Sequence, residues 1–254
     1  MSNFELLELD PIDCDAYQTK EVLKILLHSI IFQRALGACR LCDAESDLLD
    51  VSYVRCDSRA ICQRVEEYAE SFSSALERSA MAPLTAATAT GAAGPPPTTI
   101  VTASSATPTR LPARICVSFV ERRSRPSAFG LFRGEEKVTW ERWHIDLRVR
   151  PPEAPPSELA SVGGSSLGVS SGGSTGGAEG RLRHHQQQQL GDVIRTRLET
   201  ILTCTASRKE HLPPADGLGG DSTSWFEVTS DSESWTGLGD LLNRFSGRGS
   251  FKPF

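Results

Sequence analysis

The stretch Val138–Val149, VTWERWHIDLRV, alternates like a buried β-strand, but the phase of the alternation changes partway along it. Val138 and Trp140 share one parity, and the apolar residues after them share the other. One additional residue near Glu141 and Arg142 would bring both sets onto one face, so the pattern predicts a β-bulge there. The apolar residues after the change are Trp143, Ile145, Leu147 and Val149.

A second strand is predicted just upstream, at Arg114–Glu121, where Ile115, Val117 and Phe119 share one face. The connection from Ser124 to His144, SRPSAFGLFRGEEKVTWERWH, is rich in glycine and charged residues at its start. We therefore expect an antiparallel hairpin whose loop carries two large aromatic side chains.

Three amphipathic segments predict helices. The first, Tyr17–Leu36, follows a capping-box pattern made by Asp15 and Gln18 and ends before Gly37. The second begins after Asp57 or Ser58, and its apolar positions are Ile61, Val65, Tyr68, Phe72 and Leu76. The third is Leu190–Cys204, and its predicted inward positions are Leu190, Val193, Ile194, Leu198, Ile201 and Leu202. The remaining strands are expected at Phe4–Leu9, Leu48–Arg55 (with Leu49, Val51 and Tyr53 on one face) and Ser224–Thr229.

These elements predict an α+β fold, an antiparallel sheet with three helices packed on one side, in one domain spanning residues 1–254. Two segments interrupt it. Residues 80–112 consist mainly of Ala, Thr, Ser, Gly and Pro, and residues 151–189 run through GGSSLGVSSGGSTGG to HHQQQQ. Neither contains enough apolar surface to offset its ordering entropy, so we expect disordered insertions. A short C-terminal tail, residues 235–254, has weak helical spacing interrupted by glycines.

Composition excludes several classes of function. The formal net charge is −5, with a sequence pI of about 5.6, which argues against a nucleic-acid-binding protein. Neither an apolar leader nor a run of bilayer-spanning length is apparent, so an intracellular protein with reduced thiols is expected. The basic cluster ERRSR, residues 121–125, indicates a solvated loop base, or at most weak peripheral contact with an anionic membrane.

The sequence contains no catalytic pattern, so we expect a protein that is not an enzyme, with no cofactor and no metal. Cys39 and Cys42 form a single C-x-x-C, and a zinc site of that type needs a second pair of ligands at matching spacing. Cys56 and Cys62 do not have that spacing. A zinc or thiol protein using Cys39 and Cys42 therefore stands as the less favoured alternative.

The order of these segments resembles the family of autophagy-related protein 101, which has a HORMA fold. The resemblance is carried by SYVR at Ser52–Arg55, WERW at Trp140–Trp143 and EHLP at Glu210–Pro213, and it covers most of the chain outside the two insertions. It implies an adaptor that heterodimerises with and stabilises the HORMA domain of autophagy-related protein 13 in the autophagy-initiating kinase complex. It also implies a cytoplasmic protein that is recruited to the preautophagosomal structure.

The family also implies an exposed hairpin loop with a Trp-Pro-Phe pattern that recruits downstream autophagy factors. Here the aromatic loop, residues Ser127–Phe132, reads SAFGLF and lacks the tryptophan. By the resemblance, the partner-binding residues are Phe129, Gly130, Leu131 and Phe132. Another HORMA adaptor, of the spindle-checkpoint or meiotic type, is the same-class alternative, but it would be favoured by a longer C-terminal belt than this chain has.

Overall fold

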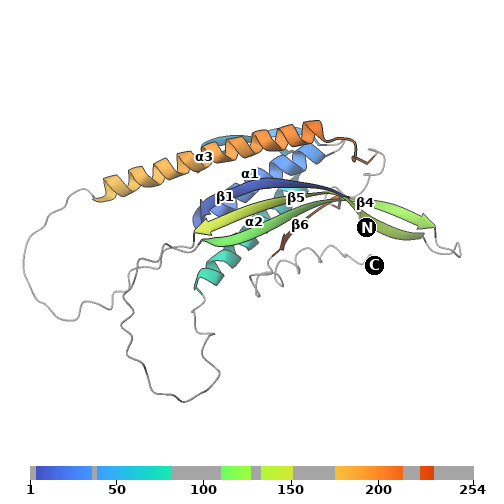
Figure 1. Cartoon of the computed structure of the whole chain (residues 1–254), viewed down its shortest axis with the longest axis horizontal. Helices are drawn as coiled ribbons and strands as arrows, with labels where there is room; N and C mark the ends of the chain where they lie inside the picture. The colour runs from blue at the N-terminus through green and yellow to red at the C-terminus, as the bar shows by residue number, and fades with distance from the viewer. Residues whose placement is uncertain are drawn as a thin grey trace, which may run out of the picture.

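The computed structural model describes residues 4–35, 39–81, 110–126, 133–150, 175–213 and 224–231. In chain order the elements are β1 (Glu5–Asp15), α1 (Ala16–Arg34), β2 (Leu41–Ser46), β3 (Val51–Cys56), α2 (Arg59–Met81), β4 (Leu111–Pro126), β5 (Arg133–Arg150), α3 (Thr175–Ser207) and β6 (Phe226–Asp231). The α+β class is confirmed. Figure 1 shows the helices gathered on one side of the main sheet, with α3 running along its β1 edge.

The main sheet has the strand order β1-β5-β4-β6. The predicted β4–β5 hairpin is confirmed, and β6 also pairs with β4 in antiparallel orientation. Strand β1 differs, because it runs parallel to β5. The sheet is therefore mixed where the sequence indicated an antiparallel one. Local alternation does not encode strand direction, which is set by the path of the chain through α1 and the segments that follow.

The predicted bulge is confirmed. Phe119 pairs with Glu141 and the next residue, Val120, pairs with Thr139, so Trp140 is the additional residue of β5. The bulge places Trp140 and Trp143 in the core together, at 6% and 0% exposure. A second irregularity lies in β1 between Leu9 and Ile12. It contains Pro11, which has no N–H to donate and is tolerated at bulges of edge strands.

Helix α1 is the centre of the core. The backbone N–H of Asp15, the residue before the helix, donates to Gln18 Oε1 at 2.9 Å, as the capping-box pattern predicts. The helix contacts α2, α3, β1, β3 and β5, which leaves no apolar face uncovered along its middle turns. The side chains with 0% exposure are Val22, Leu23, Ile25, Leu26, Leu27, Ile30 and Ile31.

Strand β2 was not predicted and pairs with β3 in a separate two-stranded sheet. Its sequence, LCDAES, has no β-branched residue and only a partly apolar face, so pairing with β3 decides its conformation. The turn between the strands ends at Asp50, which has a φ of 51°. Aspartate is among the residues that tolerate this left-handed region. Buried Leu49, Val51 and Tyr53 confirm the predicted inner face of the second strand.

The predicted bounds of both insertions need correction, and the larger change is in the second. Helix α3 begins at Thr175, so residues 175–189, which we assigned to the low-complexity insertion, are helical. Gln, Arg and Leu are good helix formers, and the Leu190–Cys204 helix supplies the nucleus that they extend. At the other insertion, α2 continues to Met81 and β4 begins at Leu111. The tail at residues 235–254 lies outside the described residues.

Candidate partner-binding surface

The WERW segment builds a buried polar cluster midway along the β4–β5 hairpin. The Glu141 carboxylate is fully buried, and Arg34, at the end of α1, is 2% exposed. Arg34 Nε donates to both Glu141 oxygens at 2.8 and 2.9 Å, and the guanidinium also donates to the carbonyls of Thr205 and Arg208 at 3.2 and 3.1 Å. A buried charge pair of this kind is tolerated because its hydrogen-bonding capacity is used.

Two aromatic residues complete the coordination of the Glu141 carboxylate. Trp143 Nε1 donates to one oxygen at 2.6 Å, and His211 Nε2 lies 2.6 Å from the other. His211 also packs against Trp140, with ring centroids 5.8 Å apart. The cluster therefore ties α1, the β5 bulge and the segment after α3 to one point. It has the geometry of a structural cross-link, and it fixes the orientation of the hairpin.

Sequence analysis did not identify this cluster. One signal was available: Glu141 has the same parity as Trp143 and Ile145, which marks it as a charged residue on the buried face of its strand. No comparable signal identified Arg34, which follows the apolar run of α1, or His211, which stands in the EHLP motif. Arg34 is 107 positions and His211 is 70 positions from Glu141 in the sequence, so only tertiary structure brings them together.

The far end of the hairpin extends beyond the helices, as Figure 1 shows. The strand pairing continues to Pro126 and Arg133, so residues 127–132 form the connection. The predicted binding residues Phe129, Gly130, Leu131 and Phe132 all belong to that connection and lie outside the described residues. The basic cluster before it is partly compensated, because Arg123 Nε donates to Glu121 at 3.0 Å.

Helix α3 presents apolar side chains to solvent. Leu190, Ile194 and Ile201 are buried as predicted. Val193 and Leu202 were predicted to point inward and are instead 37% and 52% exposed, because the inward face of α3 is narrower than the apolar pattern suggested. Leu182, on the helical extension that we assigned to the insertion, is 59% exposed.

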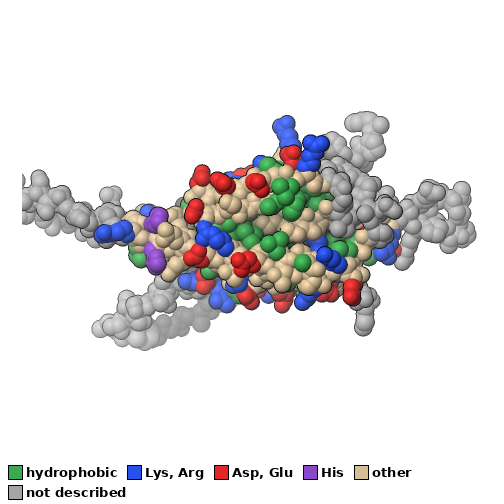
Figure 2. All heavy atoms as spheres, turned by 90° about the horizontal axis from the view of Figure 1, so that it is seen from above, with side chains coloured by type: hydrophobic (Ala, Val, Ile, Leu, Met, Phe, Trp, Pro, Cys, Tyr) green, Lys and Arg blue, Asp and Glu red, His purple; other side chains and the backbone are tan. Residues whose placement is uncertain are grey.

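Figure 2 looks onto this side of the molecule and shows hydrophobic side chains interspersed with charged ones, away from the two histidines at the end of the described part. We define the α3 surface as the solvent-facing side of α3, with Leu182 and Val193 along one flank and Leu202 on the opposite flank. Several of the charged side chains beside it are paired. Arg197, for example, lies 3.0 Å from Asp10 of β1, and Arg208 lies 2.8 Å from Glu5. The surface therefore combines exposed apolar side chains with several charges that are already paired within the chain, and protein–protein interfaces combine apolar and polar groups in this way.

The cysteines do not assemble a metal centre in the part of the chain that the structure describes, where no group of three or more potential ligands forms. Cys42 pairs across the hairpin with Arg55, whose guanidinium donates to Cys62 Sγ at 3.2 Å. An arginine between two thiols opposes a cation. Across the described helices, none has the length and apolar character needed to cross a membrane.

The site and the fold together define an α+β domain of the kind expected for a HORMA-like fold, and its exposed features are an extended hairpin and the α3 surface. A family model for autophagy-related protein 101 matches residues 11–217. The chain is 27% identical over 247 residues to autophagy-related protein 101 of Arabidopsis thaliana, an alignment that covers 95% of this chain and 94% of that one. The chain belongs to the autophagy-related protein 101 family.

Proposed function

We propose that this autophagy-related protein is a non-enzymatic adaptor that heterodimerises with the HORMA domain of autophagy-related protein 13 and stabilises it within the autophagy-initiating kinase complex. It acts in the cytoplasm and at the preautophagosomal structure. Family membership supports the role in autophagy. The observation that supports a partner is the α3 surface, where Leu182, Val193 and Leu202 are left exposed by a domain that buries nearly every other large aliphatic side chain of its described helices.

Helices α1 and α3 differ in what they leave for a partner. Helix α1 is covered by other elements of this chain, and its middle turns are fully buried. Helix α3 has an inward face made by Leu190, Ile194 and Ile201 and exposes Val193 and Leu202 on its flanks. Burying an exposed leucine stabilises an association by about 1.5–3 kcal/mol. These exposed side chains support α3 as the surface that we propose for the partner.

The second part of the proposal concerns the aromatic loop. The β4–β5 ladder holds the two ends of residues 127–132 side by side, beyond the helices. The buried Glu141 cluster anchors the middle of the same hairpin. Phe129 and Phe132 on such a support would act as anchors for downstream autophagy factors, since aromatic side chains dominate the binding energy of many interfaces.

Co-purification tests the first part. The full chain is expressed with the autophagy-related protein 13 HORMA domain of the same source and analysed by size-exclusion chromatography with light scattering. We expect a one-to-one complex that Leu202→Asp weakens. Leu41→Asp is the matched control, because Leu41 is 60% exposed but belongs to β2. A chain that stays monomeric beside a folded partner, or equal weakening by both variants, would contradict the assignment of α3.

The loop is tested separately with the double variant Phe129→Ala and Phe132→Ala. We expect the heterodimer to form normally while recruitment of downstream factors in cells is lost. Normal recruitment by the double variant would exclude the aromatic loop as the binding element. Loss of the heterodimer itself would show that the loop acts in dimerisation.

A further inference from the structure

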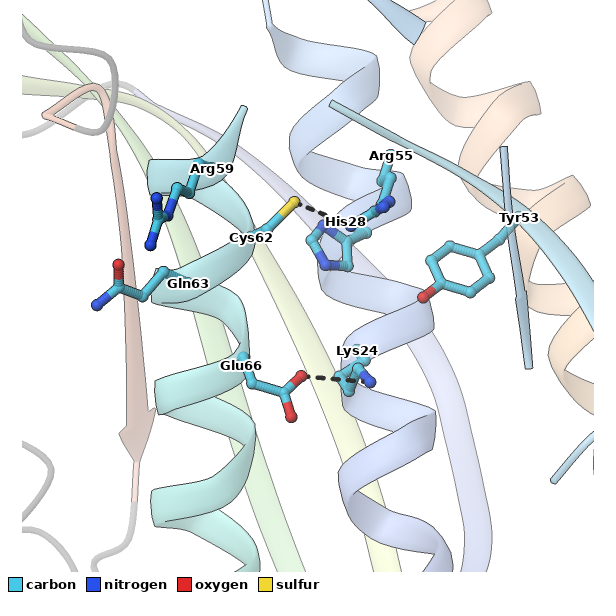
Figure 3. Close-up of a pocket in the computed structure, with 8 residues that line it drawn as sticks. All are labelled: Lys24, His28, Tyr53, Arg55, Arg59, Cys62, Gln63 and Glu66. Carbon is cyan, nitrogen blue, oxygen red and sulfur yellow. Dashed lines mark hydrogen bonds and ion pairs between the residues drawn. The ribbon is translucent and has the colours of Figure 1, made fainter. Parts of the chain in front are cut away.

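An open pocket lies between α1 and α2, on the side where β3 joins them, and has a volume of about 520 Å³ (Figure 3). We call it the α1–α2 pocket. Its lining comes from all three elements, so the pocket exists only in the folded domain. One wall carries Cys62 of the first turns of α2, whose thiol is half-buried and is not part of a disulfide. The pocket therefore presents a nucleophilic side chain to a molecule that enters it.

The Cys62 sulfur is held by the chain on two sides. Arg55 Nη1, from β3, donates to the sulfur at 3.2 Å, and the thiol can itself donate to the carbonyl oxygen of Cys56, 3.6 Å away. The pKa of Arg55 is raised, and the largest cause is its charge interaction with Cys62. The thiolate is the form of cysteine that attacks a disulfide. A cation in contact with the sulfur compensates the negative charge that this attack requires.

Two buried polar atoms of the pocket have no hydrogen-bond partner among the described residues, namely Arg55 Nε and His28 Nδ1. His28 is 4% exposed, and Figure 3 shows its ring between Arg55 and Cys62. Burial, followed by the charges of Arg55 and Lys24, lowers the pKa of His28 from 6.5 to about 4, so the ring is neutral at neutral pH. Unpaired buried polar atoms are destabilising, and a bound molecule with matching groups would remove that cost.

We propose that Cys62 is a modification site, at which the chain forms a mixed disulfide with a small cysteine-containing peptide of the glutathione type. Arg55 Nε is a free donor, and the neutral ring of His28 can accept at Nδ1. A peptide group supplies the matching pair, a carbonyl that accepts and an N–H that donates, close to the sulfur of its own cysteine. The pocket volume lies in the range of about 300–1,000 Å³ that is usual for ligand sites, which suits a peptide of this size.

The bond is formed by thiol–disulfide exchange with glutathione disulfide. The Cys62 thiolate attacks one sulfur of that disulfide, and the new sulfur–sulfur bond forms as the old one breaks. The bonding electron pair leaves with the second glutathione, which takes up the proton that Cys62 released. The Cys62 sulfur is oxidised and the leaving sulfur is reduced, so the exchange needs no other oxidant.

Two other half-buried thiols serve as references within the same chain. Cys42 lies opposite Arg55 in the β2–β3 pairing and, after Cys62, also raises the pKa of Arg55, but it is not part of the pocket lining. Modification of Cys42 would therefore depend on charge without the pocket. Cys204 lies on α3, where no arginine of the described residues donates to its sulfur. It reports the reactivity of a half-buried thiol that has neither feature.

The experiment uses the full chain, first reduced and then freed of reductant. Glutathione disulfide is added at neutral pH, samples are quenched with acid over time, and the remaining thiols are alkylated. Peptide mapping by mass spectrometry then gives a rate for each cysteine. We expect Cys62 to be modified at least about tenfold faster than Cys204, the effect of one charged hydrogen bond, and dithiothreitol to reverse the modification. Equal rates at these two cysteines, or faster modification of Cys42, would overturn the proposal.

Arg55→Gln and Arg59→Gln are matched variants, because each removes one arginine of the same pocket. The Arg59 side chain points away from Arg55 and His28 (Figure 3). Arg55→Gln should slow modification of Cys62 by about tenfold or more, and Arg59→Gln should leave the rate nearly unchanged. Equal slowing by both variants would show that net charge, and not contact with the sulfur, sets the rate. Thermal melts check that both variants fold, and the comparison of Cys62 with Cys204 requires neither.

A second disulfide separates recognition by the pocket from the reactivity of the sulfur. Hydroxyethyl disulfide has no peptide group, so Cys62 should prefer glutathione disulfide over it more strongly than Cys204 does. His28→Leu should reduce this preference to that of Cys204 without slowing the reaction with hydroxyethyl disulfide. An unaltered preference in His28→Leu would refute the peptide-binding role of the pocket. None of these outcomes affects the proposed adaptor function, because the α3 surface is formed by other residues.

Discussion

The buried pair of Arg34 and Glu141 provides the sharpest test of how this domain is held together. Their side chains are 2% and 0% exposed, and the two groups are joined by hydrogen bonds of 2.8 and 2.9 Å. Arg34→Met preserves much of the apolar length of the side chain and removes the guanidinium. The Glu141 carboxylate would then stay buried without its cation.

The expected cost follows from that burial. Breaking a buried ion pair by removing one partner destabilises a protein by about 3–5 kcal/mol, a large share of a typical total of about 5–15 kcal/mol. The carbonyls of Thr205 and Arg208 lose their donors as well, so the segment after α3 should loosen. At roughly 2–4 °C per kcal/mol for a chain of this size, the melting temperature should fall by roughly 6–20 °C.

The pair Arg114 and Asp146 is the matched control. It is also bidentate, at 2.7 and 2.8 Å, but its side chains are 44% and 32% exposed. Arg114→Met should cost only about 0–1 kcal/mol, because water solvates the carboxylate that remains. The two variants therefore differ in burial and share the same chemical change.

Equilibrium urea denaturation, followed by circular dichroism and tryptophan fluorescence, measures both variants. The double variant Arg34→Met with Glu141→Leu should recover part of the loss, since the uncompensated charge is removed, but Trp143 and His211 would lose their acceptor. A cost for Arg34→Met as small as that of Arg114→Met would refute the reasoning that this cluster cross-links the domain.

Three further predictions concern other parts of the chain. Gly191→Ala should destabilise the domain despite the better helix propensity of alanine, because the added Cβ would lie 2.5 Å from the backbone oxygen of Leu49. Gly180→Ala should instead stabilise the domain by up to about 1 kcal/mol, because its Cβ would meet nothing within 4 Å. Thermal melts of the two variants test the difference. The pKa of His28 is lowered from 6.5 to about 4 in the folded domain, so folding requires the neutral imidazole. The free energy of unfolding should therefore be unaffected by this histidine above pH 6.5 and should fall, by about 3 kcal/mol at most, as the pH drops toward 4. Urea titrations across this range should show less pH dependence in His28→Gln. Metal analysis of the purified chain should find no stoichiometric zinc, and stability should be unchanged in Cys42→Ser; zinc that is lost in that variant would restore the zinc alternative.

Local patterns were sufficient for the elements that have strong periodicity. The phase change in Val138–Val149 predicted the bulge that the pairing of Phe119 with Glu141 and Val120 with Thr139 confirms. The apolar spacing of α2 predicted its buried face, and Asp15 with Gln18 predicted the start of α1. These features depend on contacts within a few residues or on an alternation that burial imposes directly.

The errors occurred where contacts between distant residues decide the outcome. Strand β2 has weak intrinsic preference and depends on pairing with β3. Val193 and Leu202 have the spacing of core residues, but the surface that α3 packs against is too narrow to cover them. The start of α3 at Thr175 was missed because the composition of residues 175–189 indicated a low-complexity insertion. A helix that has already formed downstream can extend into such a segment when its residues have good helix propensity.

The sequence by itself determined the fold class, the order of its helices and most of its strands, the bulge, and the family to which it is similar, because these depend on periodicity and on the order of short motifs. Tertiary structure alone decided that β1 is parallel to β5, that Arg34, Glu141 and His211 meet in one buried cluster, and that Arg55, Arg59 and His28 line one pocket. The physical reason is that charge compensation, hydrogen-bond satisfaction and exposure are properties of neighbours in space. These residues become neighbours only when the helices close over the sheet.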